Sequence, residues 1–176
     1  MSGRQYLLGL GGNIGDRAQF IAQAIEALAE LRGAQILAIS EAVDSDPVGY
    51  TEQGNFLNIC VAITYNCSSQ DLLREALGIE QKLGRVRTIK DGPRTIDIDI
   101  LFIEDGRVVS EELIVPHPRW RDRGFVVIPL KDLLQSPALA KNQSWDFLRH
   151  EVANLSVGSE GLRKWQGPTP WMKTLR

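Results

Sequence analysis

Apolar residues in the first part of the chain follow the two periods that distinguish strands from helices. Four short apolar runs predict strands, and two segments with apolar residues three or four positions apart predict helices over about 17–31 and 69–83. The order β-α-β-β-α-β predicts an α+β fold, a ferredoxin-like plait with both helices on one face of a mostly antiparallel sheet. The predicted strands are QYLLGLGG, AQILAIS, FLNICVAITY and TIDIDILFI.

The ends of the two helical segments carry residues that are typical of helix caps. Asp16 precedes the first segment, and Ser68 or Ser69 is expected to cap the second, because these side chains accept hydrogen bonds from the free amides of a first turn. Gly84 follows the second segment, where a left-handed residue commonly ends a helix. The caps therefore agree with the boundaries that the apolar spacing predicts.

The remaining segments have weaker patterns. Residues 41–55, EAVDSDPVGYTEQGN, are predicted to form a loop, and a loop of this length is often functional. After a turn at EDG, the chain from RVV onward is expected to add a C-terminal extension of extra strands and helices. QGPTPWMKTLR has two prolines and no period, so residues 1–165 are expected to form one domain and 166–176 a loose tail.

The fourth predicted strand carries two aspartates on one face. Because side chains alternate along a strand, Asp97 and Asp99 should share a face with Leu101 and Ile103, opposite the face that holds Phe102. Carboxylates about 7 Å apart repel each other unless a cation lies between them. Oxygen ligands without histidine or cysteine favour Mg²⁺, although a bare D-x-D pattern also fits a solvated strand edge.

Basic residues gather on both sides of this strand in the sequence. Guanidinium groups bind phosphate in a bidentate manner, and phosphoryl transfer requires neutralisation of the charge on the transferred group. The clusters therefore indicate a phosphate site next to the aspartates, with solubility of the surface as the simpler alternative. Their members are Arg85, Arg87, Lys90 and Arg94 before the aspartates, and Arg119, Arg121 and Arg123 after them.

Two further polar residues are candidates for the same cleft. Glu80 lies in one row with Leu73 and Leu77 of the second predicted helix, so it either faces the arginines or extends to the edge of the apolar stripe. His117 lies between two prolines beside the second basic cluster, where it is either structural or a hydrogen-bond donor to phosphate.

The stretch GLGGNIGD resembles a dinucleotide-binding turn but has the wrong spacing. Ile14 stands where a third glycine or alanine would be required, so a nicotinamide-dependent oxidoreductase remains only a minor alternative. The glycines are instead expected to let the strand turn tightly and approach a ligand closely.

Composition narrows the class of protein. With 20 basic and 22 acidic residues, the net charge of -2 gives no general attraction to nucleic acid or to an anionic membrane. The apolar run at the N-terminus is shorter than a signal peptide requires and no apolar run is long enough to span a membrane, so a cytoplasmic location is expected. Cys60 and Cys67 are expected to be buried free thiols.

Taken together, the motifs are specific enough to indicate a family. GPRTIDIDIL, preceded by GRVR and followed by PHPRWRDRGFVVIPL, resembles the 6-hydroxymethyl-7,8-dihydropterin pyrophosphokinases of folate biosynthesis. The resemblance extends from LGLGGNIGD through DPVGYTEQGNFLN to about Trp165. It implies a Mg²⁺-dependent enzyme that moves the pyrophosphoryl group of ATP to the pterin hydroxymethyl oxygen and leaves AMP. A non-catalytic ferredoxin-like module that senses a nucleotide is the alternative.

The resemblance also implies roles for individual residues and small-molecule substrates as the only partners, in a monomer. For the metal site, Asp97 and Asp99 would hold two Mg²⁺ ions, with Asp97 also near the pterin. For ATP, the implied contacts are Glu80, Arg94, His117, Arg123 and the main chain near Ile100 and Ile114, with Arg85 and Arg87 on a mobile loop that closes over the site. For the pterin, they are Phe56 and Phe125 on the ring faces, and Asn58 with the backbone around Ser45 and Val48 on the ring edge. Departures from the family pattern are Asp91 in place of an aromatic residue, and Val43 and Ser45 in place of tyrosine and threonine.

Overall fold

The computed structural model describes residues 3–86 and 89–175, and its central sheet contains the four predicted strands. The strand β1 (Arg4–Gly12) lies in the middle and pairs antiparallel with both β4 (Phe56–Tyr65) and β5 (Asp97–Ile103). The side of β4 that does not face β1 pairs with β2 (Ala34–Ile39), also antiparallel. The order β5-β1-β4-β2 is that of a ferredoxin-like plait, so the predicted fold is confirmed.

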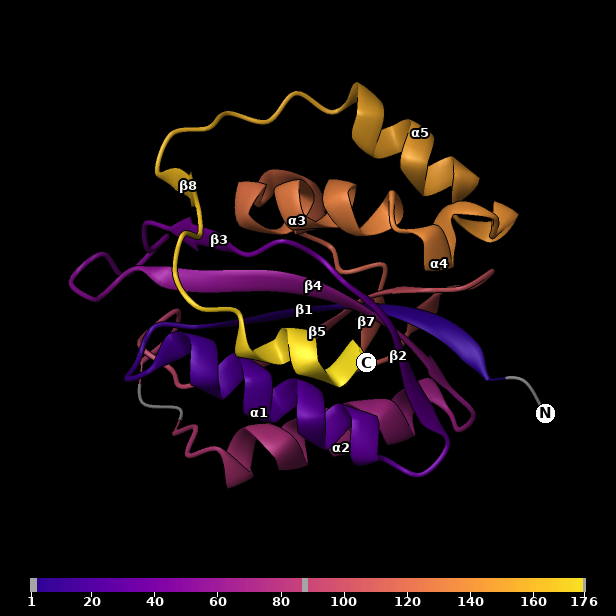
Figure 1. Ribbon diagram of the computed structural model, residues 1–176, viewed down its shortest axis with the longest axis horizontal. Helices are drawn as coiled ribbons and strands as arrows, with labels where there is room; N and C mark the ends of the chain where they lie inside the picture. Colours follow the sequence, from indigo (N-terminus) through magenta and orange to yellow (C-terminus); the bar gives the residue numbers. More distant parts are fainter. Residues whose placement is uncertain (1–2, 87–88, 176) are drawn as a thin grey trace.

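The two predicted helices cover one face of this sheet (Figure 1). The helix α1 (Arg17–Glu30) begins after Asp16, whose side chain accepts a hydrogen bond from the Gln19 amide. The helix α2 (Ser69–Lys82) begins after Ser68, which forms a capping box with Asp71. Both helices therefore start where their capping residues predicted, with Ser68 rather than Ser69 as the second cap.

The opposite face of the sheet is covered by the C-terminal extension (Figure 1). It contains α3 (Gly124–Leu134), the short α4 (Pro137–Ala140) and α5 (Asp146–Asn154), with single 3-10 turns at Trp120–Asp122 (η1) and Gln143–Trp145 (η2). A separate hairpin pairs β6 (Val108–Val109) with β7 (Ile114–Val115). The extension gives the sheet two covered faces, which the plait alone does not have.

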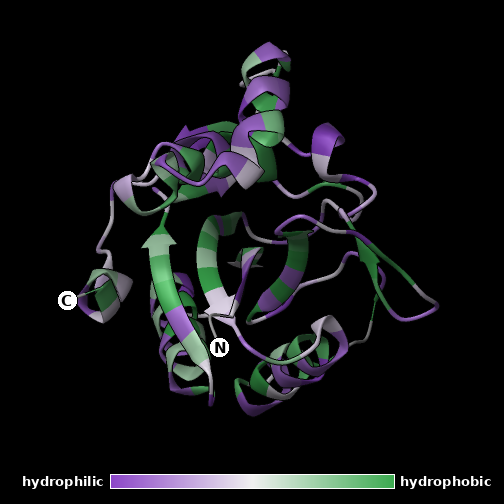
Figure 2. Cartoon of the chain, turned by 90° about the vertical axis from the view of Figure 1, so that its right-hand side faces the viewer, coloured by the Kyte–Doolittle hydropathy of each residue, from purple (hydrophilic) through white to green (hydrophobic). Residues whose placement is uncertain are grey.

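The sheet separates two hydrophobic clusters, one on each face. Leu8 and Ile59 belong to the cluster under α1 and α2, while Leu7 and Cys60, their neighbours in sequence, belong to the cluster under α3 and α5. Figure 2 shows hydrophobic residues along the strands and on the helix faces that point toward them. Burial of apolar surface on both faces is therefore what fixes the orientation of each strand.

The alternation of side chains along β5 is interrupted by a bulge. Leu8 pairs with Ile100 but Leu7 pairs with Phe102, so one residue of β5 has no partner on β1. As a result Phe102 lies with Leu101 in the cluster under α3, and Ile103 lies in the other cluster. The predicted faces of Phe102 and Ile103 are therefore wrong, because an extra residue shifts every later side chain to the other face.

Two short strands were not predicted. Within the expected loop 41–55, β3 (Val43–Ser45) pairs with β4, and β8 (Leu162–Lys164) pairs with β3 at the edge of the sheet. Strands of three residues are too short to show a period of two, so the loop prediction is wrong at these positions. Both β2 and β3 pair with β4, so the sheet follows the order β5-β1-β4-β3-β8 with β2 as a further neighbour of β4.

The C-terminal segment also differs from the expected loose tail. Residues Pro170–Leu175 form a 3-10 helix, η3, which lies beside α1 and β2. Trp171 is only 1% exposed and belongs to the cluster under α1. A single large aromatic side chain is enough to hold such a segment, and no apolar period is needed to do so.

The two cysteines differ in their surroundings. Both are free, but only Cys60 is buried as expected, whereas Cys67 is exposed. In the described ranges, no helix has the length and apolar character that are needed to cross a membrane.

Replacement of Trp171 tests the packing of η3. Trp171→Ala should lower the free energy of unfolding by about 3–5 kcal/mol, because it empties a fully buried site. Met172→Ala is the matched control, since Met172 is the next residue in the sequence and its side chain is 46% exposed. Urea unfolding followed by circular dichroism measures both, and equal midpoints for the two variants would show that the segment does not stabilise the fold.

Candidate active site

A pocket of about 670 Å³ lies between the sheet and the start of α3. Its floor comes from three adjacent strands, through Asp97 and Asp99 of β5, Gly9 and Gly11 of β1, and Asn58 of β4. The predicted polar cleft next to the two aspartates is therefore present on the face of β5 that the alternation predicted.

Strand register explains why the floor is open. Asp97 lies opposite Gly11, which in turn lies opposite Asn58, and Asp99 lies opposite Gly9. A Cβ atom on Gly11 would come within 2.2 Å of Asn58 Oδ1. Gly9 and Gly11 are inside a continuous strand, so the expected tight turn at these glycines is wrong, but their missing side chains do leave room above the sheet.

Asp97 is surrounded by arginine side chains. Its carboxylate accepts a hydrogen bond from Arg85 and lies 3.6 Å from Arg94 Nη1. The same nitrogen of Arg85 donates to Glu80 Oε1 at 2.5 Å, so Arg85 bridges two carboxylates. Of the predicted arginines in this loop, Arg87 lies outside the described residues.

The backbone of Arg94 is fixed by Asn13 at the end of β1. The Arg94 amide donates to Asn13 Oδ1 at 2.9 Å, and the Asn13 amide donates to the Arg94 carbonyl at 2.9 Å. Asn13 Nδ2 also donates to Gln53 Oε1, and Gln53 Nε2 donates to the carbonyl of Asp91 at 2.8 Å. These hydrogen bonds connect three loops around Arg94. Asp91 takes part through its main-chain carbonyl, and its backbone is left-handed with a φ of 56°.

Asp99 has fewer nearby arginines than Asp97, with a single guanidinium within 4 Å among the described residues. Burial in the pocket floor and the nearby charge of Asp97 raise the pKa of Asp99 to about 7, against the opposing effect of Arg123, Arg94 and Arg85. The nearest of these, Arg123 Nη1, is 3.8 Å from Asp99 Oδ2. A carboxylate with a raised pKa in a pocket is a group that a cation would stabilise in its charged form.

Glu80 does not extend into solvent. Its side chain is buried, accepts a hydrogen bond from the Ile98 amide at 3.0 Å and points toward Arg85. Burial raises the pKa of Glu80 to about 7, an effect that the Ile98 amide opposes and that the charge of Asp97 increases. Of the predicted arginines, Glu80 thus contacts Arg85, and it does not line the pocket.

The predicted ATP residues that lie outside the pocket lining are distributed around β5. Within residues 3–86 and 89–175, the outer edge of β5 has no neighbouring strand in the main sheet. At this edge the Ile98 amide donates a hydrogen bond to Glu80, and the Leu101 carbonyl accepts one from the His117 amide. Ile100 is buried in β5, and Ile114 is exposed on β7 beside it.

His117 is held in one tautomer. The Arg119 amide donates to His117 Nδ1 at 3.2 Å, which leaves the ring proton on Nε2. Burial lowers the pKa of His117, and the charges of Arg123 and Arg119 lower it further. The imidazole is therefore a neutral hydrogen-bond donor at neutral pH.

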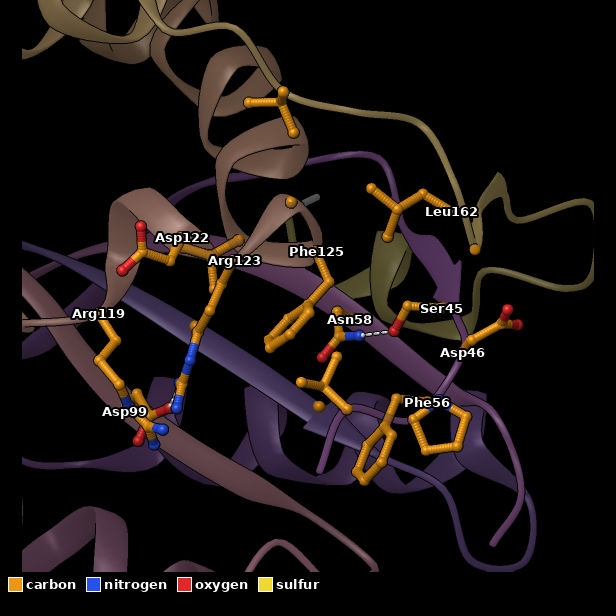
Figure 3. A pocket seen from close by; sticks show the side chains of 18 of the residues that line it. Ser45, Asp46, Phe56, Asn58, Asp99, Arg119, Asp122, Arg123, Phe125 and Leu162 are labelled. Atoms are coloured by element: carbon orange, nitrogen blue, oxygen red, sulfur yellow. Dashed lines mark hydrogen bonds and ion pairs between the residues drawn. The ribbon is translucent and has the colours of Figure 1, made fainter. Parts of the chain in front are cut away.

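The other half of the pocket is aromatic. Phe56 extends from β4 and Phe125 from the first turn of α3, while Asn58 Nδ2 donates to Ser45 Oγ at 2.8 Å between them (Figure 3). The guanidinium of Arg94 lies 5.0 Å from the centre of the Phe56 ring, and that of Arg123 lies 5.7 Å from the Phe125 ring. Val48 lines the outer rim.

Several lining residues were not assigned a role from the sequence. One of them is Arg119, which extends toward Asp99 beside the predicted Arg123 in Figure 3. Asp46 and Pro47 follow β3, and the segment 156–162 closes the side of the pocket that is farthest from β5. The basic cluster pointed to Arg119, whereas the segment 156–162 has no motif by which it could have been found.

Comparison with known proteins now identifies this arrangement. Residues 7–135 match the family model for 7,8-dihydro-6-hydroxymethylpterin-pyrophosphokinase (HPPK). This chain belongs to the HPPK family. The match includes every residue that was predicted for the pocket, and it ends before the segment 156–162.

Curated relatives of this HPPK chain agree with the family model. A 2-amino-4-hydroxy-6-hydroxymethyldihydropteridine pyrophosphokinase of Bacillus subtilis is 36% identical over 159 residues, which cover 90% of this chain and 89% of that protein. A protein of the same name from Methylorubrum extorquens is 45% identical over 126 residues, 72% of this chain and 80% of that protein.

Solved structures support the fold of the HPPK chain. A triple mutant of Plasmodium falciparum HPPK-DHPS with SDX-DHP superimposes with a TM-score of 0.63 at 14% identity, covering 93% of this chain and 45% of that one. A second HPPK-DHPS structure, with pteroate, has the same TM-score at 15% identity and covers 93% of this chain and 46% of that one. The HPPK chain thus spans about half the length of these larger proteins.

The raised pKa of Asp99 predicts how stability depends on pH. The folded state keeps a proton on Asp99 up to about pH 7, whereas an unfolded aspartate loses it near 3.8, so this group destabilises the fold progressively between pH 4 and 7. Asp99→Asn removes that effect. Its gain in unfolding free energy over the wild type should therefore be larger at pH 8 than at pH 5.

Chemical denaturation at the two pH values without divalent cations measures this difference. Glu111→Gln, at an exposed turn, serves as the control and should show the same stability as the wild type at both. A gain for Asp99→Asn that does not change with pH would show that the Asp99 carboxyl has an ordinary pKa.

Proposed function

We infer that this HPPK chain catalyses the reaction for which its family is named, transfer of the pyrophosphoryl group of ATP to the hydroxymethyl oxygen of 6-hydroxymethyl-7,8-dihydropterin, with release of AMP. The observation that carries the assignment of roles is the position of Asp97. It lies between the aromatic half of the pocket and the outer edge of β5, where the two substrates would have to meet.

The aromatic half fits the pterin. Phe56 and Phe125 offer flat faces to a planar heterocycle. Asn58, with an amide and a carbonyl oxygen, can pair with the ring edge, and its bond to Ser45 fixes which way the amide points. Ser45 stands in place of threonine but retains a hydroxyl, and this hydroxyl accepts the hydrogen bond from Asn58. The backbone of Val48 would complete this side.

The edge of β5 fits ATP. His117, Arg94 and Arg123 would contact the phosphates, with Arg119 as an additional cation beside them. The main chain near Ile100 and Ile114 would hold the adenine, and Glu80 would lie on the same side. Arg85 and Arg87, on the loop before β5, would close over the phosphates once both substrates are bound.

The two aspartates fit Mg²⁺. A cation with oxygen ligands typically takes one or two carboxylates and completes its coordination with substrate phosphates and water, which matches an Asp97–Asp99 pair with no third ligand among the described residues. We therefore assign Asp97 and Asp99 as the ligands of two Mg²⁺ ions. When bound, Mg²⁺ supplies charge neutralisation for the phosphates.

The protein side chains then act mainly by positioning. The hydroxymethyl oxygen must lie in line with the β-phosphorus, so that its bond to phosphorus forms as the bond to the α-phosphate oxygen of AMP breaks. Arg94 links the two halves, because it contacts Asp97 on one side and the Phe56 ring on the other. Arg85 would exchange its carboxylate partners for the transferring phosphates, whose charge it would stabilise.

Formation of AMP is the direct assay of this function. Purified protein with ATP, Mg²⁺ and the reduced pterin should release AMP, and omission of the pterin should abolish the release. Asp97→Asn and Asp99→Asn should each lower kcat by about 100-fold or more, because the charge that opposes the phosphates is no longer held in place. Glu111→Gln should turn over like the wild type. AMP formation at the same rate with and without pterin would refute the proposal.

Arg85 is expected to act on the chemical step rather than on ATP binding. Arg85→Ala should lower the single-turnover rate by about 100-fold, while the Kd for an ATP analogue changes little. Arg74→Ala is the control, since Arg74 lies on the exposed face of α2 and pairs with Asp71. Equal single-turnover rates in the wild type and Arg85→Ala would contradict the role of Arg85.

A further inference from the structure

The segment 156–164 follows α5 and returns to the sheet across the side of the pocket. Six of its residues line the cavity, and all lie beyond the part of the chain that matches the HPPK family model. They are Ser156, Val157, Gly158, Glu160, Gly161 and Leu162. We call this segment the side wall.

The side wall is attached to the strand that carries Ser45. In the pairing of β8 with β3, Leu162 lies opposite Ser45, and Arg163 lies opposite Asp44. Two hydrogen bonds flank this pairing, from the Asp46 amide to the Gly161 carbonyl at 2.8 Å and from the Trp165 amide to the Ala42 carbonyl at 3.1 Å. The position of Leu162 is thus set by the short ladder of hydrogen bonds between β3 and β8.

Ion pairs reinforce the short ladder. One nitrogen of Arg163, Nη2, lies 2.8 Å from a carboxylate oxygen of Asp44 and 2.8 Å from one of Asp46. Asp44 also accepts a hydrogen bond from Arg17 at 2.9 Å, which connects the cluster to α1. A network of several charges with one shared guanidinium stabilises more than an isolated surface pair does. We call Arg163, Asp44 and Asp46 the clasp.

The inner surface of the side wall contacts the start of α3. A Cβ atom on Gly124 would come within 2.6 Å of Leu162 Cδ1 and 3.1 Å of Val157 Cγ1, so both side chains pack directly on the glycine. Gly124 lies between Arg123 and Phe125. Figure 3 shows the Leu162 side chain on the far side of Phe125 and Ser45 from Asp99.

We propose that Leu162 is a pterin-contacting residue and that Arg163, through the clasp, positions the side wall against the pterin. The inference deepens the proposed function and rests on it, since it needs the pterin to lie between Phe56 and Phe125. In the strand order β5-β1-β4-β3-β8, the side wall and the outer edge of β5 are at opposite ends of the sheet. Leu162 therefore contacts the pterin, and ATP binds out of its reach.

Steady-state kinetics with each substrate varied in turn test this separation. Leu162→Ala should raise the KM for the pterin about tenfold or more, because an apolar contact with the pterin is lost, with the KM for ATP within twofold of the wild type. Arg163→Ala should have the same pattern, and Arg163→Lys should restore part of the pterin affinity by keeping one ion pair. Lys164→Ala is the matched control, since Lys164 pairs with Glu41 at 3.2 Å outside the clasp.

Amide hydrogen exchange separates positioning from general stability. In Arg163→Ala the amides of Asp46 and Trp165 should exchange faster, while those of β4 remain protected. Faster exchange with an unchanged pterin KM would show that the side wall does not contact the substrate. An equal rise in the KM of both substrates would show that the clasp only supports the fold. Either result overturns the proposal.

Calorimetric titration of the reduced pterin, with a non-hydrolysable ATP analogue present, compares pterin affinity in the wild type and the two variants without turnover. A weaker pterin Kd in Leu162→Ala and Arg163→Ala supports the side wall even if the wild type forms no AMP, in which case only the proposed function fails. Equal Kd values for the wild type and both variants overturn the side-wall proposal, whatever the AMP assay shows.

Discussion

The rest of the site depends on the repulsion between two carboxylates on one face of an edge strand. Asp97 and Asp99 point into the same pocket, and the pKa of Asp99 is raised to about 7 because burial and Asp97 together disfavour its charge. Arg85, Arg94 and Arg123 reduce this cost but do not remove it. Because such a pair costs stability, it supports the proposed role of Asp97 and Asp99 as ligands of Mg²⁺ beside the substrate phosphates.

The strand order places the two proposed substrate regions at different parts of the sheet. Among the described residues, the outer edge of β5 pairs with no strand of the main sheet and is the edge proposed for ATP, whereas the glycines of β1 open the floor between β5 and β4. At the other end, β3 and β8 enclose the aromatic side. In the proposed function the reacting groups would meet above Asp97, where Arg85 and Arg94 lie close enough to stabilise charge.

Local patterns explain which features could be predicted from the sequence. The four main strands and both helices have clear periods and caps, and the D-x-D pattern with its arginines indicated the polar cleft that the structure contains. The bulge at Leu101 has no such signal, because it depends on pairing with β1. The positions of β3, β8 and Trp171 also have no local signal. Each depends on contacts between a few residues that are far apart in the sequence. The side wall was missed for this reason.

The most direct test of the central claim is the pKa of Asp99, measured by carboxyl-carbon NMR titration of the wild type. Without ligands the titration should have a midpoint near pH 7. With Mg²⁺ and a non-hydrolysable ATP analogue, the midpoint should fall below the ordinary aspartate value of 3.8, since bound cations favour the charged carboxylate. A midpoint that stays near pH 7 with both ligands bound would contradict the assignment of Asp99 to the metal site.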